Sequence, residues 1–103
     1  MGACSNAYTN GNLPDSRFGG ATAFGYWDDL MIYSGTSQSV YYNVLGSQPT
    51  RQVVFEFFES HYTSSVNYYH FQMVFFENAP GIVEYTYYIS TDGGSSATIG
   101  IQS

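Results

Sequence analysis

Lysine is absent from this 103-residue sequence, and Arg17 and Arg51 are the only side chains that are cationic at neutral pH. Eight acidic residues therefore leave a formal net charge of −6. Nucleic-acid binding depends on neutralising phosphates with Lys and Arg, and attraction to an anionic membrane surface depends on the same residues. The composition thus argues against nucleic acids and anionic lipid surfaces as partners.

Cysteine is equally scarce, since Cys4 is the only one. One thiol can form neither an internal disulfide nor a cysteine-based metal site. We interpret Cys4 as a free thiol near a loose end, or as a residue that pairs with a cysteine outside this sequence. No apolar run reaches the roughly 18 residues that span a bilayer, and the first residues lack the basic and apolar regions of a signal peptide. We expect no membrane insertion. The chain is then either cytosolic or a mature or excised domain that is extracellular or on the cell surface. Its composition, which is rich in Tyr, Ser, Thr, Asn and Gly and lacks lysine, favours the second alternative.

Helical periodicity is missing as well, because no 11-residue segment repeats apolar residues at helical spacing. Aromatic residues instead make up 19% of the chain, and aromatic and β-branched residues favour strands. Short strand-like segments separated by turn residues predict an all-β fold, an antiparallel, jelly-roll-like β-sandwich with little or no helix. We expect an irregular N-terminal arm over residues 1–21 and a single β-sandwich domain over residues 22–103.

The period-two pattern also predicts which side chains face the core. A polar loop is expected at 59–67 and a four-residue hairpin turn at 78–81. The inward side chains of the three central strands are expected to be Val53, Phe55, Phe57, Tyr69, Phe71, Met73, Phe75, Val83, Tyr85, Tyr87 and Ile89. The strands themselves are expected at residues 22–27, 30–34, 39–45, 51–58, 68–77, 82–89 and 96–101.

The segment around Trp27, Asp28 and Asp29 holds the only Trp and the only adjacent pair of acids. Two buried, unpaired carboxylates would cost several kcal/mol each, so the acids must reach water or be held by partners. One interpretation has one acid accept backbone hydrogen bonds while the other pairs with Arg51. The alternative is a Ca²⁺ ion, which takes six or more oxygen ligands. We therefore regard Trp27, Asp28 and Asp29 as candidate binding residues and expect no obligatory cofactor or metal.

Catalytic patterns are not evident. His61 and His70 have no further ligands at zinc-binding spacing, and the sequence has no Gly-x-Ser-x-Gly nucleophile motif. Glu56 and Glu84 could be imagined as the carboxylate pair of a glycoside hydrolase, but acids on the solvent side of a sheet more often keep it soluble. These observations predict a protein that is not an enzyme.

Tyrosine is the more informative residue, since 11 occur in the chain. Aromatic rings stack on sugar faces and give interfaces a large contact area at low entropic cost. Tyr68 and Tyr88, on the side opposite the expected core, are the candidate contacts for a glycan or an extracellular protein. The tyrosines in excess of what one core can hide are Tyr41 or Tyr42, Tyr62, Tyr68, Tyr69 and Tyr88. Some of these rings could instead cover the second sheet.

A second possibility for the function is a self-assembling subunit of a fibre or homo-oligomer, because the strand edges lack lysine.

Several of these segments follow one another in a characteristic order. They are Phe24 with Tyr26-Trp27-Asp28-Asp29-Leu30, Val40-Tyr41-Tyr42, a turn from Gly46 to Arg51 that leads into Val53-Val54-Phe55-Glu56-Phe57, His70-Phe71-Gln72-Met73-Val74-Phe75-Phe76-Glu77, Ile82-Val83-Glu84-Tyr85, and Ser96-Ala97-Thr98-Ile99-Gly100-Ile101-Gln102. Over residues 22–102 this set resembles the nidogen-type extracellular module, in the single-domain form found in secreted and surface proteins of fungi and bacteria. The resemblance implies an extracellular β-sandwich of adhesion or matrix-type proteins, without enzymatic activity.

Overall fold

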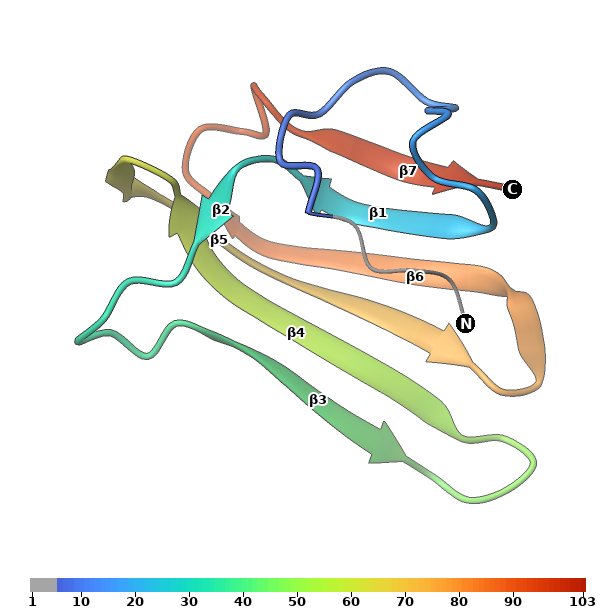
Figure 1. The fold of residues 1–103 in the computed structure, drawn as a ribbon. Coiled ribbons are helices and arrows are strands. Elements are labelled where there is room, and N and C mark those ends of the chain that lie inside the picture. Colours follow the sequence, from blue (N-terminus) through green and yellow to red (C-terminus); the bar gives the residue numbers. More distant parts are fainter. Residues whose placement is uncertain (1–5) are drawn as a thin grey trace.

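The computed structural model describes residues 6–103, and within them it contains seven strands and no helix (Figure 1). This confirms the prediction of an all-β fold. Cys4 lies outside the described residues. The strands are β1 (Thr22–Trp27), β2 (Leu30–Met31), β3 (Ser39–Leu45), β4 (Gln52–His61), β5 (Ser64–Phe76), β6 (Ala79–Ser90) and β7 (Thr98–Gln102).

Five of the strands form one antiparallel sheet. Consecutive strands β3, β4, β5 and β6 pair in sequence order, and the short β2 shares the same edge of β4 with β3. The register sets Tyr42 opposite Phe55 and Phe55 opposite Met73. Because directly opposed residues of antiparallel strands share a face, one side of this sheet carries a continuous band of large apolar side chains.

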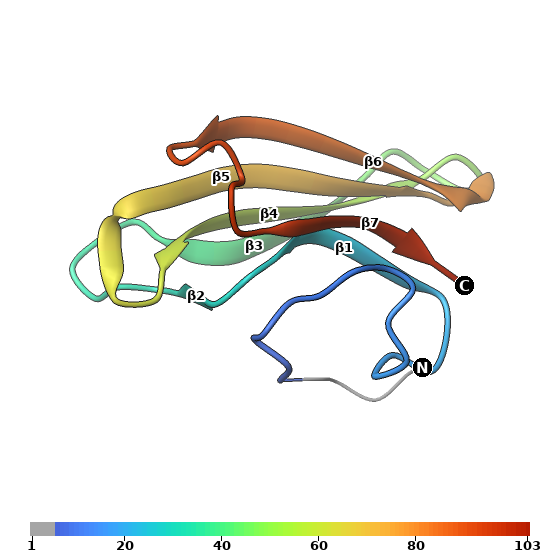
Figure 2. The same cartoon turned by 90° about the horizontal axis from the view of Figure 1, so that it is seen from above.

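The remaining strands, β1 and β7, form a two-stranded antiparallel sheet that packs on this apolar face (Figure 2). The N-terminal arm, from residue 6 onward, covers the other side of the small sheet without forming a strand. Gln102 of β7 holds the arm, since its Nε2 donates to the carbonyl oxygens of Asp15 and Phe18 and its Oε1 accepts from the Asp15 amide. The small sheet therefore lies between two layers, which explains why β1 is buried from Phe24 to Trp27.

The core between the two sheets is largely aromatic. Tyr26 from β1 packs on Tyr69 and Phe71 from β5, with ring centroids 4.4 and 5.7 Å apart. Phe71 also stacks nearly parallel on Phe57 of β4 at 4.8 Å. Gly25 lets β1 approach this closely, since a Cβ atom built there would lie 2.6 Å from the Met73 sulfur. The expected inward faces of β4 and β5 are confirmed by these contacts.

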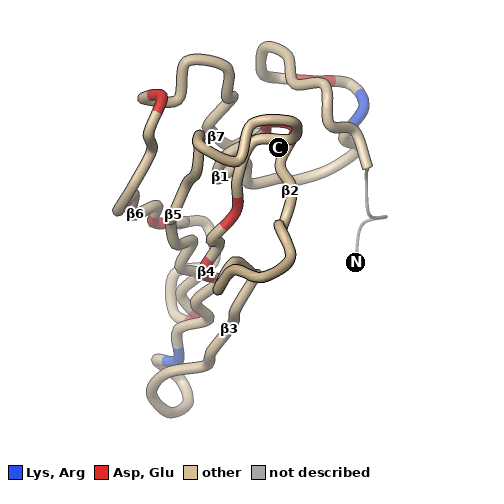
Figure 3. The backbone as a smooth tube through the Cα atoms, turned by 90° about the vertical axis from the view of Figure 1, so that its left-hand side faces the viewer, with Lys and Arg blue, Asp and Glu red and all other residues tan. Residues whose placement is uncertain are grey.

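The small sheet covers only part of the larger one. In Figures 1 and 3, β3 lies at the end of the molecule far from β1 and β7. Val40, Tyr42 and Val44 of β3 lie opposite Phe57, Phe55 and Val53 and thus share their face. Val40, Tyr42 and Val44 are nevertheless 44%, 75% and 50% exposed. The apolar face therefore continues past the core into solvent.

Two predicted connections are wrong. The expected polar loop at 59–67 is mostly strand, because β4 runs to His61 and β5 begins at Ser64. Only Tyr62 and Thr63 form the turn, with Thr63 in the left-handed region at φ 67°. Likewise the 78–81 turn is shorter and earlier, at Glu77 and Asn78, so that Pro80 and Gly81 lie within β6. Polar residues concealed strand backbone in the first place, and Pro80 and Gly81 concealed it in the second. There the irregular register between Phe75 and Phe76 accommodates them.

One predicted face is also wrong. Ile89 of β6 was expected to point inward, yet it lies opposite His70 on the outer side and is exposed. The register shifts between His70 and Phe71, where two β6 residues fit against one β5 step. Such a bulge reverses the alternation beyond it. Ser90 consequently takes the inward position, where its hydroxyl lies 3.2 Å from the Tyr26 hydroxyl.

Candidate functional site

Four rings lie side by side in a row across the outer face of the large sheet. In spatial order they are Tyr68, Phe58, His70 and Tyr88, and we call them the aromatic row. Phe58 of β4 is directly opposite His70 of β5. Successive ring centroids are 6.3, 5.4 and 5.1 Å apart. Tyr68 is 36% and Tyr88 54% exposed, so the two ends of the row reach solvent. The sheet thus presents a chain of rings on the side away from the core.

Polar side chains lie beside the aromatic row. Gln72 Nε2 donates to Glu56 Oε1 at 2.9 Å, and His70 Nε2 lies 3.3 Å from the same oxygen. The hydrogen bond from Gln72, together with the nearby His70, lowers the pKa of Glu56 from its ordinary value. Thr86 of β6 is opposite Gln72 and adds a hydroxyl to this side of the sheet. An ionised carboxylate, an amide and a hydroxyl therefore accompany the rings.

This combination suits a ligand with both apolar faces and many hydroxyl groups. Aromatic rings provide contact area, and the neighbouring carboxylate and amide oxygens can accept hydrogen bonds while the amide nitrogen can donate them. The outer face carries no arginine, because Arg17 is in the arm and Arg51 precedes β4 at the end of the molecule near β3 (Figure 3). The site can therefore stack and hydrogen-bond a neutral ligand, but it has little to offer an anion.

The predicted binding residue Trp27 lies elsewhere, beneath the N-terminal arm. It packs against Phe18 and Phe24 with centroids about 5 Å apart, at 5.1 and 5.2 Å. The Arg17 guanidinium lies 4.8 Å above the ring, and the indole Nε1 donates to the Ala7 carbonyl oxygen. These contacts bury the side chain and attach the arm to β1. Within residues 6–103 no hydrogen bond, ion pair or ring contact connects it to Tyr68 or Tyr88.

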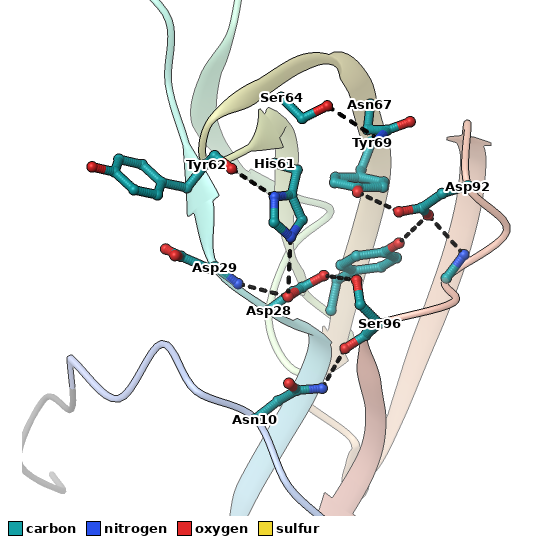
Figure 4. Close-up of polar contacts among 12 residues, drawn as sticks. Asn10, Asp28, Asp29, His61, Tyr62, Ser64, Asn67, Tyr69, Asp92 and Ser96 are labelled. Carbon is teal, nitrogen blue, oxygen red and sulfur yellow. Dashed lines mark hydrogen bonds and ion pairs between the residues drawn. The ribbon is translucent and has the colours of Figure 1, made fainter.

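Asp28 and Asp29 lie in the connection from β1 to β2 (Figure 4). Asp28 accepts hydrogen bonds from the Asp29 amide at 2.8 Å and the Ser96 hydroxyl at 2.6 Å, and His61 Nε2 is 3.7 Å away. Asp29 uses its backbone carbonyl to accept from the Tyr62 amide. The expectation that one acid accepts backbone hydrogen bonds fits Asp28. The pair fixes where β1, the β4–β5 turn and the segment before β7 meet.

The proposed pairing of Arg51 with Asp28 or Asp29 is wrong. Arg51 pairs with Glu77, with Nη2 2.7 Å from Oε1 and Nε 2.8 Å from Oε2, and it holds the pKa of Glu77 at about 2. The reason is the length of β4, whose ten residues span roughly 30 Å of extended chain. Arg51 precedes β4, whereas the two acids lie near its far end, where Leu30 pairs with His61.

Asp92 is an important residue that the sequence did not reveal. Its carboxylate accepts hydrogen bonds from the hydroxyls of Tyr69 at 2.7 Å and Tyr26 at 3.1 Å, and from the Gly94 amide at 3.0 Å (Figure 4). Burial acts to raise the pKa of Asp92, but these hydrogen bonds outweigh it and the net shift is downward. Nothing local in the Asp92-Gly93-Gly94 segment indicates contacts with two tyrosines from other strands.

No three His, Cys, Asp or Glu side chains gather into a metal-binding group anywhere from residue 6 to 103. Ca²⁺ at Asp28 and Asp29 stays an untested alternative. The same residues include no helix long and apolar enough to cross a membrane.

The sandwich and its aromatic row define a small all-β module. The family model described as "NIDO related" matches residues 2–103, and the chain belongs to this nidogen-related family. The match includes the N-terminal arm as well as the strands, which extends the resemblance noted from residue 22 onward. Neither the curated proteins nor the solved structures contain a match.

Proposed function

We propose that the protein is a non-catalytic extracellular recognition module that binds a glycan through the aromatic row, with an extracellular protein as the alternative partner. The observation that carries the proposal is the chain of rings from Tyr68 to Tyr88 beside Glu56 and Gln72. Membership of the nidogen-related family supports an extracellular, adhesion-type setting. The recognition is expected to rest on stacking and hydrogen bonds.

Replacing the exposed tyrosines should weaken binding to any ligand found on a glycan array. Tyr68→Ala and Tyr88→Ala should each cost about 1–3 kcal/mol of binding free energy, the scale of an interface hot spot. The affinity of the parent protein should change by less than a few-fold between low salt and about 0.5 M salt, because screening acts on exposed charges. Titration calorimetry with the strongest array ligand provides both measurements.

Tyr8→Ala is the matched control, since Tyr8 is exposed in the arm, away from the large sheet. It should bind like the parent protein. An affinity that collapses with salt, or that ignores both Tyr68 and Tyr88, would reject the aromatic row as the binding surface.

Self-association is the second candidate function, and the uncovered face of β3 favours it. Val40, Tyr42 and Val44 continue the apolar face of the sheet without a charge among them. Two copies could therefore meet there without like-charge repulsion, despite the net charge of −6. A second copy is the occupant that we assign to this face, because exposed apolar strands at a sheet edge promote such pairing.

Light scattering during size exclusion tests this second candidate. It predicts a dimer or larger species for the parent protein and a shift to monomer for Val44→Glu, which places a charge on the uncovered face. Val66→Glu, at an exposed β5 residue far from β3 in the sequence, serves as the control and should leave the assembly intact. A parent protein that is monomeric at all concentrations would remove self-association from consideration.

A further inference from the structure

A cavity lies between the small sheet and the larger one, on the side covered by the arm. Its volume is about 310 Å³, and most of its wall is apolar. The side chains that matter for its chemistry are Phe18, Trp27, Phe57, Phe71, Met73 and a single acid, Glu59. This cavity is separate from the aromatic row, which lies on the opposite face of the large sheet.

Glu59 is the one acid in the wall of this cavity. It lies opposite Tyr69 in the register of β4 and β5, which places it on the inner face of the sheet. No hydrogen bond or ion pair from residues 6–103 reaches its carboxylate. Burial raises the pKa of Glu59, and no partner offsets this effect. Glu59 remains partly exposed, so solvent reaches the cavity beside it.

The described part of the chain supplies no cation for this acid. Arg17 pairs with Asp15, Arg51 pairs with Glu77, and lysine is absent. The two histidines lie beside Asp28 and Glu56. A half-buried carboxylate without a partner destabilises the fold, and an acid perturbed by desolvation within a cavity is a candidate for ligand binding.

The walls of the cavity indicate which ligand would satisfy Glu59. The apolar wall suits the alkyl part of a ligand, and Glu59 supplies a negative charge for a cationic head group. The ring faces of Trp27 and Phe71 are already covered, since the Arg17 guanidinium lies over Trp27, and Phe57 and Tyr26 pack on Phe71. The rings therefore add apolar surface, and the charge of Glu59 decides which ligand fits. Met73 adds a polarisable thioether that adapts to irregular ligands. A neutral apolar ligand would leave the carboxylate unpaired, and an anion would be repelled by it.

We propose that this cavity binds an alkylammonium group, with Glu59 as its counter-ion and the apolar wall around its alkyl part. The group has two possible sources, a small free quaternary ammonium compound, or a lysine side chain of a partner protein. Neither source depends on the aromatic row, so this site stands independently of the proposed glycan binding.

Fluorescence of Trp27 offers a direct readout, because Trp27 is the only tryptophan and lines the cavity. Choline represents the free quaternary ammonium compound, and N-acetyl-lysine-N′-methylamide represents a lysine side chain. Each probe has a neutral counterpart of similar shape, 3,3-dimethyl-1-butanol and N-acetyl-norleucine-N′-methylamide. We expect a saturable change in Trp27 emission with at least one cation, and affinity at least about tenfold weaker for its neutral counterpart. Whichever cation binds more tightly identifies the source.

Glu59→Gln separates the charge from the shape of the cavity. We expect it to weaken cation binding at least about tenfold, while its melting temperature at neutral pH stays equal to or rises above that of the parent, since an unpaired charge is removed. Glu84→Gln is the matched control, because Glu84 is an exposed acid on the outer side of β6, and its binding should be unchanged. Tyr88→Ala should also leave cation binding intact, which distinguishes this site from the aromatic row.

The proposal would be overturned if neither cation changed the emission up to about 10 mM, a concentration well above the dissociation constants of typical specific complexes. Equal binding of the cations and their neutral counterparts would also overturn it, as would full cation binding by Glu59→Gln. A melting temperature that falls in Glu59→Gln would also contradict it, since that result would mean that the carboxylate has a structural partner.

Discussion

Phe71→Ala should lower the free energy of unfolding by about 3–5 kcal/mol, the cost of deleting a buried aromatic ring and leaving a cavity. Phe71 is almost fully buried and contacts both sheets. It stacks on Phe57 at 4.8 Å within its own sheet and on Tyr26 of the small sheet at 5.7 Å. Its loss should therefore weaken the packing of the two sheets on each other, because its ring contacts both of them.

Urea unfolding at equilibrium measures this loss, and Val66→Ala provides the control. Val66 lies in the same strand but is exposed, and such surface changes usually stay within about 0.5 kcal/mol. A Phe71→Ala protein that unfolds at the same urea concentration as the parent would show that β1 and β7 do not pack on β5 as described.

Asp92→Ala should be the second most damaging substitution, with a loss of about 2–4 kcal/mol, because hydrogen bonds to a charged group contribute about 1.5–3 kcal/mol each. Asp92 accepts from Tyr26 and Tyr69 together. Tyr69 is fully buried, so its hydroxyl would lose its partner without gaining water. Tyr69→Phe removes the hydroxyl itself and should cost less than Asp92→Ala. In the double variant the two losses should not add, because they share one interaction.

Acid should reveal the charge on Asp92. Its pKa is lower in the folded protein than the ordinary value of 3.8. A group whose folded pKa is depressed adds stability above its unfolded pKa and loses it as the pH falls through the folded pKa. The difference in unfolding free energy between the parent and Asp92→Asn should therefore be full at pH 7 and shrink below about pH 4. A difference that is constant from pH 7 to pH 2.5 would show that folding does not lower the pKa of Asp92.

The strands could be predicted from the sequence where alternation is strong. Tyr69, Phe71 and Met73 repeat at every second position, and this repeat placed their strand and its inner face correctly. The prediction was wrong where polar residues continue a strand, as at Ser60 and His61. Their hydroxyl and imidazole groups resemble loop composition, although both residues pair with β5 across an irregularity in the register. Ile89 was misplaced because a bulge arises from how two strands fit together, and one strand alone carries no sign of it.

The candidate sites were less predictable, because they depend on contacts between distant segments. Tyr68 and Tyr88 could be assigned to the outer face from alternation alone. The ring of Phe58 between Tyr68 and His70 depends on the register of β4 with β5. Glu59 and Asp92 look like ordinary surface acids in the sequence, and only the packing of β1 against the large sheet gives them their surroundings.

The most direct test of whether the aromatic row is the recognition surface is an NMR titration with the strongest ligand from the glycan array, in which changes in backbone amide chemical shifts are mapped onto the structure. The proposal predicts that the perturbed amides cluster on the outer face of β4, β5 and β6, around Glu56, Phe58, Tyr68, His70 and Tyr88. Perturbations confined to β3 or to the N-terminal arm, or an array without a single binding glycan together with no shift on adding candidate matrix proteins, would contradict it.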